Sequence, residues 1–171
     1  PRIVTAIQDG SFFTNPAFQK AADHVKNNPA TAGLHLIGLF SSGSVHAYVD
    51  HLYALLEFAG RENIPRVFLH LFTDGRDAPQ KEAGAFFPQL KERLEKKYPN
   101  AKIASLMGRA FAMDRDERWE QIRRAYACLT EGKGDAFRDP LAYLKESYAK
   151  EKTDESIEPA FLTDERGAPI G

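Results

Sequence analysis

The chain of 171 residues has a single cysteine, Cys128, so it forms no internal disulfide and no zinc site built from clustered cysteines. Its formal net charge is only -1, so no overall positive field favours nucleic acid or an anionic membrane surface. It has no apolar stretch of membrane-spanning length, and its first residues lack the apolar core of a signal peptide. We therefore expect a cytoplasmic protein that binds neither nucleic acid nor membrane.

Several catalytic and cofactor-binding motifs are also missing from the sequence. It contains no G-x-G-x-x-G or Walker glycine loop, no G-x-S-x-G nucleophile elbow and no H-E-x-x-H metal motif. What is present is the composition of a globular protein, with 43% hydrophobic and 27% charged residues. The length suits one domain over residues 1–171.

Apolar periodicity divides the chain into strands that alternate with helices. Strands are predicted over residues 34–40, 67–72 and 103–107. Helices are predicted over residues 3–7, 16–27, 45–59, 81–97, 116–130 and 140–149. This alternation predicts the α/β class: three layers, a mostly parallel sheet and helices on both faces. Three strands are few for such a sheet, which suggests a part of something larger.

Arginine and aspartate occur together where two of the predicted strands end. Arg76 follows the strand over residues 67–72, and Arg109 and Arg115 follow the strand over residues 103–107. Ligands of open α/β sheets bind beyond the carboxyl ends of the strands, and arginine suits the oxygens of phosphate and carboxylate. The three arginines therefore predict a site for a small polyanion.

Asp77 is the candidate acid–base group of this site. Gly75 allows a sharp turn, so that Arg76 and Asp77 both project over the strand end. A carboxylate beside a guanidinium stays ionised and is placed to act as a base toward a bound hydroxyl. The alternative is an ion pair within the loop, with Asp77 capping a turn.

His46 follows the third candidate loop, Ser41-Ser42-Gly43-Ser44, whose backbone N–H groups and hydroxyls are suited to an anion. The alternative is a structural or surface histidine at the start of a helix. His70 is expected on a sheet face or in the core. Cys128 and Trp119, on the apolar face of the helix over residues 116–130, are expected to pack inside.

In order along the chain, these segments resemble the cofactor-independent (2,3-bisphosphoglycerate-independent) phosphoglycerate mutases. The matching stretches are AIQDGSFF (6–13), LFSSGSVH (39–46), DGRD (74–77), the block over 108–119 with AMDRDERW, and residues 148–159 with TDE. The resemblance covers nearly the whole chain, and the block over residues 108–119 is its most specific part.

The resemblance implies an isomerase that moves a phosphoryl group between the 3- and 2-positions of glycerate through a phosphoserine. In that family an alkaline-phosphatase-like domain holds the serine and two manganese ions, and a second domain inserted into it binds the substrate. This chain resembles the inserted domain alone, with no cofactor of its own and the phosphatase-like domain of the same parent chain as its partner. The family's contacts to 3- and 2-phosphoglycerate carry over to His46, Arg76, Asp77, Arg109 and Arg115, with Asp77 and His46 as the catalytic pair.

Two departures from the family pattern limit this expectation. The family reads S-D-G-G-V-H-S-H around the histidine, whereas this chain has Ser42 for the aspartate, Ser44 for a glycine, and Ala47 and Tyr48 after His46. The family's F-R-x-D-R segment, the serine and the metal ligands are absent, so the isolated chain is expected to be inactive. The other functions to weigh are a non-catalytic phosphometabolite- or anion-binding module, and a scaffold whose arginines only form ion pairs.

Overall fold

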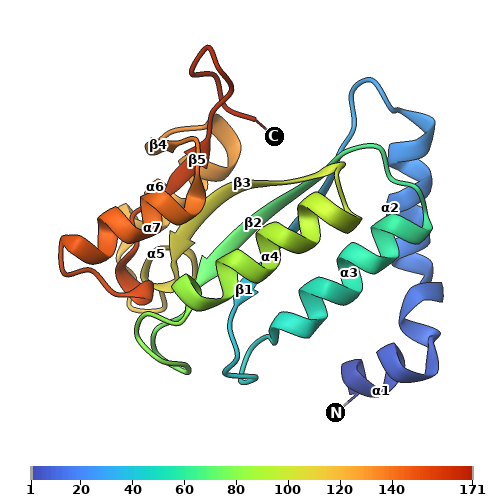
Figure 1. Ribbon diagram of the computed structural model, residues 1–171, viewed down its shortest axis with the longest axis horizontal. Coiled ribbons are helices and arrows are strands. Elements are labelled where there is room, and N and C mark those ends of the chain that lie inside the picture. Colours follow the sequence, from blue (N-terminus) through green and yellow to red (C-terminus); the bar gives the residue numbers. More distant parts are fainter. Residues whose placement is uncertain (1, 171) are drawn as a thin grey trace.

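A five-stranded mixed sheet forms the centre of the molecule (Figure 1), as described by a computed structural model for residues 2–170. The strands are β1 (Leu34–Phe40), β2 (Val67–Thr73), β3 (Ala101–Gly108), β4 (Asp135–Phe137) and β5 (Ala160–Leu162). Their spatial order is β1-β2-β3-β5-β4. The β1–β2, β2–β3 and β4–β5 pairs are parallel, and the β3–β5 pair is antiparallel.

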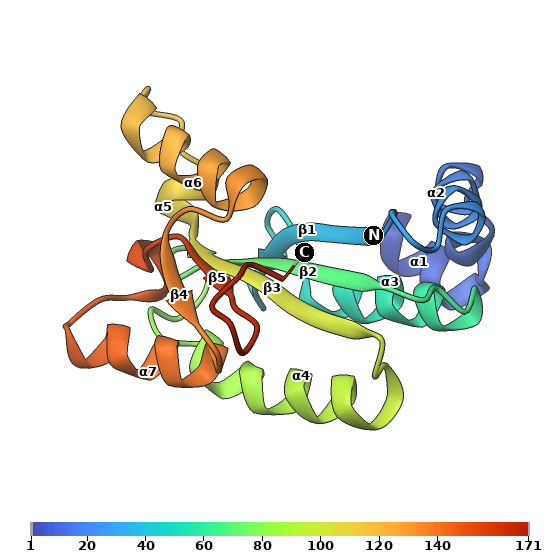
Figure 2. The ribbon, with the colours of Figure 1, turned by 90° about the horizontal axis from the view of Figure 1, so that it is seen from above.

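Helices cover both faces of this sheet, as Figure 2 shows. They are α1 (Arg2–Asp9), α2 (Pro16–Asn27), α3 (Val49–Arg61), α4 (Ala83–Lys97), α5 (Arg109–Ala112), α6 (Trp119–Glu131) and α7 (Pro140–Ala149), with the 3-10 turns η1 (Ser11–Thr14) and η2 (Asp154–Ser156). In Figure 2, α3, α4 and α7 lie on one side of the sheet, and α5 and α6 lie on the other. Among residues 2–170, no helix has the length and apolarity to cross a membrane.

The core consists of two unequal clusters. The larger one joins alternate residues of the strands, such as Leu69 and Leu71, to Leu56 of α3, Leu90 of α4 and Leu144 of α7. The smaller one, on the opposite face, consists of Met107, Phe111, Ala125 and Cys128, with partly buried neighbours around them. Because side chains of a strand alternate between faces, β2 contributes Leu69 and Leu71 to the larger cluster and packs the partly buried Phe72 against the smaller one.

The predicted class is confirmed: the sheet is mostly parallel, and helices pack on both of its faces. The predicted strand over residues 34–40 and the predicted helix over residues 140–149 match β1 and α7 to the residue. Asn15 accepts a hydrogen bond from the Ala17 N–H at the start of α2, and Asp139 accepts one from the Leu141 N–H at the start of α7. These caps fix the residues at which the two helices begin. Cys128 is buried, as predicted.

Four details of the sequence prediction are wrong. The short strands β4 and β5 were not predicted, and the segment after β3, taken as a loop, begins with α5. Helices α3 and α6 begin three to four residues later than expected, at Val49 and Trp119. Trp119 is 69% exposed rather than packed inside, because it occupies the first position of α6, beyond the edge of the small cluster.

The three parallel strands end side by side, which positions three loops together. Phe40 pairs with Thr73, and Thr73 pairs with Gly108, so the last residues of β1, β2 and β3 are in register. The turn η2 joins them from a distant part of the sequence: the Thr73 hydroxyl donates to the Asp154 carbonyl at 2.6 Å. The Gly108 N–H donates to the Ile157 carbonyl at 2.8 Å. This end of the sheet therefore carries four chain segments.

Candidate anion-binding site at the strand ends

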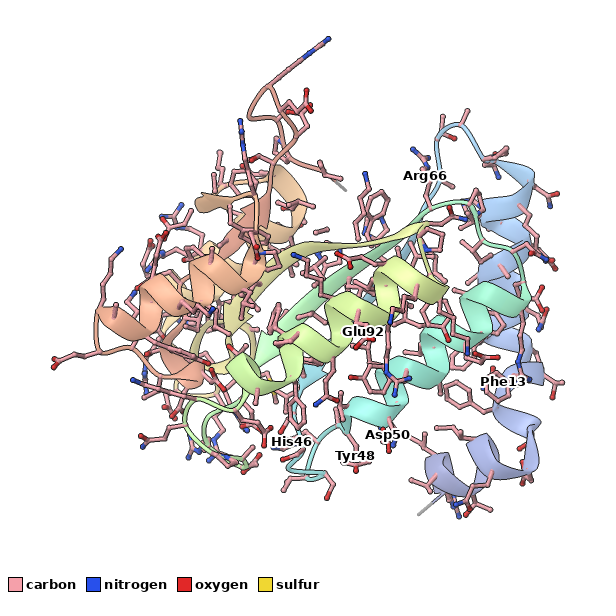
Figure 3. The ribbon with its side chains drawn as sticks, viewed as in Figure 1. Phe13, His46, Tyr48, Asp50, Arg66 and Glu92 are labelled. Carbon is pink, nitrogen blue, oxygen red and sulfur yellow. The ribbon has the colours of Figure 1, made fainter. Side chains whose placement is uncertain are left out.

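The predicted site residues lie at this one end of the sheet. Figure 3 shows His46 in the loop that follows β1, whereas Arg66 lies at the opposite end of the strands. Asp77 belongs to the loop after β2, and Arg109 is the first residue of α5, immediately after β3. The structure thus brings together the loops whose convergence the sequence predicted.

Asp74 anchors the site, although sequence reasoning gave it no role. Its side chain is only 2% exposed and accepts hydrogen bonds from the Ser41 hydroxyl (2.5 Å), from the backbone N–H groups of Arg76 (3.1 Å) and Asp77 (3.0 Å), and from Arg109 (2.7 Å). Burial by itself raises the pKa of the Asp74 carboxyl, but the four donors outweigh it and hold the pKa below its usual value. Asp74 is therefore an ionised anchor that joins all three loops.

Arg109 links this anchor to Asp77. Its Nη1 atom donates to Asp74 Oδ1 at 2.7 Å and to Asp77 Oδ2 at 2.6 Å, and its side chain is 11% exposed. Burial acts to lower the pKa of the guanidinium, but the two carboxylates raise it above its ordinary value. Arg109 stays charged and fixes the position of Asp77, so the carboxylate of Asp77 pairs with an arginine outside its own loop, and not within the loop as in the alternative.

His46 lies on the other side of Asp77. The distance from His46 Nε2 to Asp77 Oδ2 is 3.5 Å, and half of the imidazole is exposed to solvent. His46 does not open the helix as expected, since α3 begins at Val49, whose N–H donates to the Ser41 carbonyl. Asp77 thus contacts a fixed cation on one side and an accessible imidazole on the other, an arrangement suited to proton exchange.

A small cavity of about 50 Å³ adjoins this group. Arg76, Arg109, Arg115, Arg118, Glu155 and residues of the segment 110–116 line it. Arg118 donates to Asp116 at 2.5 Å, and Arg76 lies 3.6 Å from Glu155. Arg115 has no ion-pair partner among residues 2–170, so its charge is free for a ligand.

The loop Ser41–Ser44 does not present its first N–H groups to an anion as the sequence suggested. The Ser42 N–H and hydroxyl both donate to the Glu82 carboxylate, and the Gly43 N–H donates to the Ser41 hydroxyl. The loop is instead tied to the start of α4. Ser42, which stands where the family has aspartate, takes part in this link.

The sequence predicted no site role for Asp74 or Glu155, and it assigned the Ser41 hydroxyl to an anion, whereas that hydroxyl donates to Asp74. A signal for Asp74 does exist in the sequence: it is a polar residue that directly follows a buried strand, a position where a buried anchor is expected. Glu155 lies in the TDE segment that the family resemblance includes, but its place at the site was not predicted, because only the fold brings η2 beside β2 and β3. Among residues 2–170 no group of three or more His, Cys, Asp and Glu is placed to hold a metal ion, and Asp74, Asp77 and Glu155 face arginines.

Comparison with known proteins shows the family of the chain. A 2,3-bisphosphoglycerate-independent phosphoglycerate mutase of Chloroflexus aggregans is 46% identical over 169 residues, which are 99% of this chain and 31% of the relative. One of Moorella thermoacetica is 44% identical, over 99% of this chain and 32% of its own length. This chain therefore spans about a third of the curated relatives it matches.

A solved structure and a family profile indicate the same family as these relatives. The crystal structure of Leishmania mexicana phosphoglycerate mutase at low cobalt concentration superposes with a TM-score of 0.91 at 29% identity, over 99% of this chain and 32% of that one. Residues 3–171 match the family described as BPG-independent PGAM N-terminus. On this evidence the chain belongs to the N-terminal domain family of the BPG-independent phosphoglycerate mutases.

Proposed function

We propose that this chain binds phosphoglycerate for a mutase that interconverts 3- and 2-phosphoglycerate. The observation that carries the proposal is the group Asp74–Arg109–Asp77–His46 beside Arg115, a guanidinium with no ion-pair partner among residues 2–170. Glycerate phosphates carry a phosphate, a carboxylate and a hydroxyl. Arginine charges suit the two anionic groups, and a carboxylate–imidazole pair suits the hydroxyl.

Each residue has a distinct role in this proposal. Arg115 and Arg76 bind the phosphate and carboxylate oxygens. Arg109 binds the ligand less than it positions Asp77, because its Nη1 atom is already shared by two carboxylates. Asp77 exchanges a proton with the glycerate hydroxyl, and His46 contacts that hydroxyl or the phosphoryl oxygens. Fixing the ligand in one orientation is the main contribution of such a site to catalysis.

The phosphoryl transfer itself is assigned to a separate part of the parent protein. In the proposal, residues 1–171 are the substrate-binding domain, inserted in a phosphatase-like domain that supplies a phosphoserine and two manganese ions. The carboxylates of Asp74, Asp77 and Glu155 pair with arginines and are not arranged to bind a metal ion. The parent works in the cytoplasm, in glycolysis or gluconeogenesis.

Calorimetric titration of 3-phosphoglycerate into the chain tests the proposal. We expect weak binding that Arg115→Ala reduces about tenfold, as loss of a charge-assisted contact requires. Arg123→Ala is the matched control, because Arg123 pairs with Glu120 on the exposed side of α6, outside the cavity. Arg109→Ala is a less direct probe, since it leaves two carboxylates without their cation.

Two outcomes separate this proposal from its rivals. Inorganic phosphate binding as tightly as 3-phosphoglycerate, with Arg115→Ala weakening both, would favour a general anion-binding module. If Arg115→Ala binds 3-phosphoglycerate as the wild type does, or if neither protein binds it, the arginines serve the scaffold and the proposed site is wrong.

A further inference from the structure

A second cavity, of about 330 Å³, lies at the other end of β3 from the strand-end site. It is bounded by α4, by the first residues of β3 and by the segment that joins β4 to α7; Figure 2 shows α4 and α7 on the same side of the sheet. Ile103 lines it, whereas β3 reaches the strand-end site at Gly108, about 17 Å further along at the usual rise of a strand. Its volume falls within the range of small-molecule sites, about 300–1,000 Å³.

The floor of this cavity is apolar. Phe87 and Leu94 of α4 and Ile103 of β3 are buried members of the larger core cluster. Leu141 of α7 and Leu162 of β5 pack against that cluster but are only partly buried, so they leave apolar surface facing the cavity. Because removal of apolar surface from water is favourable, this floor suits the hydrocarbon part of a ligand.

Three cations line the rim of the cavity, and two of them have no acidic partner. Lys102 forms no ion pair with any residue from 2 to 170. Arg138 donates to the Glu165 carbonyl at 3.2 Å and likewise has no acidic partner in the part of the chain that the structure describes. The third cation, Lys91, lies 3.8 Å from Asp139. The side chains of Lys102 and Arg138 are therefore available to an anion.

The two carboxylates of the rim do not cancel these charges. Asp139 accepts hydrogen bonds from two backbone N–H groups at the start of α7, at 2.8 and 3.4 Å, and its other oxygen faces Lys91. Glu95 is exposed and forms no ion pair within residues 2–170. Two unpaired cations against one unpaired carboxylate leave the rim positive, so its electrostatic field favours an anion.

We propose that this cavity binds an amphiphilic anion, a small aliphatic chain that ends in a carboxylate. The chain lies against Leu141 and Leu162, and the carboxylate pairs with Lys102 and Arg138. A neutral hydrocarbon gains nothing from the two cations, and a small hydrophilic anion leaves the apolar floor in contact with water. The site is separate from the proposed phosphoglycerate site and does not depend on it.

Calorimetric titration with three probes tests the two halves of this proposal. Octanoate has both the chain and the charge, and we expect it to bind at least about tenfold more tightly than butanoate, because its four additional methylene groups leave water. Octylammonium has the same chain and the opposite charge. We expect it to bind at least about fivefold more weakly than octanoate.

Substitutions at the rim locate the binding. Lys102→Gln combined with Arg138→Gln removes both unpaired cations, and we expect this double variant to bind octanoate about tenfold more weakly than the wild type. Glu95→Gln removes a repelling charge and should tighten octanoate binding about threefold, a gain that damage to the fold does not imitate. Lys145→Gln is the matched control and leaves the affinity unchanged, because Lys145 is exposed on α7 outside the cavity.

Four results would overturn the proposal. Butanoate binding as tightly as octanoate would mean that charge acts alone, and an unchanged affinity in the double variant would mean that the cations take no part. Absence of octanoate binding to the wild type would reject the site outright. A dimer in sedimentation that the double variant dissociates would assign the cavity to a second copy of the chain instead of a small ligand.

Discussion

At the scale of single residues, the identity of the arginines was predictable, but their partners were not. Arg76, Arg109 and Arg115 stand out in the sequence because each follows a strand, and the carboxyl ends of parallel strands converge. Asp74, Asp77 and Glu155 are equally plausible partners for each arginine on sequence grounds. Only the loop conformations assign Asp74 and Asp77 to Arg109, and Glu155 to Arg76.

A second polar group lies on the sheet itself, away from the arginines. His70 is 5% exposed; its Nδ1 atom lies 2.8 Å from the Ser105 hydroxyl and its Nε2 atom lies 2.9 Å from His35 Nδ1. Burial, with a smaller contribution from His35, lowers the pKa of His70 to about 4. The prediction from sequence that His70 lies in the core or on a sheet face is confirmed.

This lowered pKa makes stability depend on pH. The imidazole of His70 has a pKa near 6.5 in the unfolded chain and about 4 in the folded chain. Between these two values the unfolded chain binds a proton at His70 and the folded chain does not, so protonation favours unfolding. The contribution of the neutral His70 to the free energy of unfolding is therefore complete above pH 6.5. It is lost as the pH falls toward 4, by up to about 1.4 kcal/mol for each pH unit. Urea unfolding between pH 7 and 4.5 measures it: the advantage of the wild type over His70→Gln shrinks with falling pH.

His24→Gln is the control for this experiment, because His24 is exposed on α2. Its unfolding free energy runs parallel to that of the wild type over the same pH range. Parallel curves for His70→Gln as well would contradict the assignment of a buried, neutral imidazole.

At the scale of elements, strong periodicity made the long helices and the three parallel strands predictable. β4 and β5 have three residues each, which is too short for a period to appear, and their pairing arises from tertiary contacts. The turn η2 escaped prediction for the same reason. Its capping box, Thr153 with Ser156, is visible locally, but nothing near it in sequence indicates that it packs on β2 and β3.

Gly108→Ala is expected to disturb the site through η2. Gly108 has φ -73° and ψ 152°, which any residue adopts, so the cost is steric: the new Cβ would meet the Glu155 carbonyl. We expect a loss of about 1–3 kcal/mol in the free energy of unfolding by urea. The binding of 3-phosphoglycerate weakens with it, because Arg109 follows directly.

Gly38→Ala provides the comparison, since a Cβ on this β1 glycine would meet no atom within 4 Å. Its unfolding free energy stays within about 0.5 kcal/mol of the wild type. Equal losses in the two variants would mean that the contact between Gly108 and η2 is not the cause.

At the scale of the whole molecule, the two core clusters differ in size and in the helices they hold. The larger one joins the sheet to α3, α4 and α7, whereas the smaller one joins it to α5 and α6. The sequence predicted two covered faces but not this inequality, because amphipathic helices do not reveal which face of a sheet they will cover. We expect the α5–α6 side to open before the rest unfolds.

The single thiol reports such opening. Cys128 is 3% exposed in the smaller cluster, and burial raises its pKa to about 11. At pH 8, a chromogenic disulfide reagent should react with the folded chain at least roughly a hundredfold more slowly than with the unfolded chain, on ionisation alone. Phe111→Ala, in the same cluster, should speed the reaction more than Leu144→Ala, in the larger cluster. Rates that follow global stability instead would show that the two sides open together.

The contact of the Thr73 hydroxyl with the Asp154 carbonyl has a consequence for the order of folding. These residues are 81 positions apart, so their contact closes a long loop of chain. Contacts at such separation form late, because the entropy of closing the loop is lost before the contact repays it. During synthesis, β1, β2 and β3 are complete well before residues 154–155 are added. A growing chain would therefore have Arg76, Arg109 and Arg115 in place before it acquires Glu155, the carboxylate that pairs with Arg76.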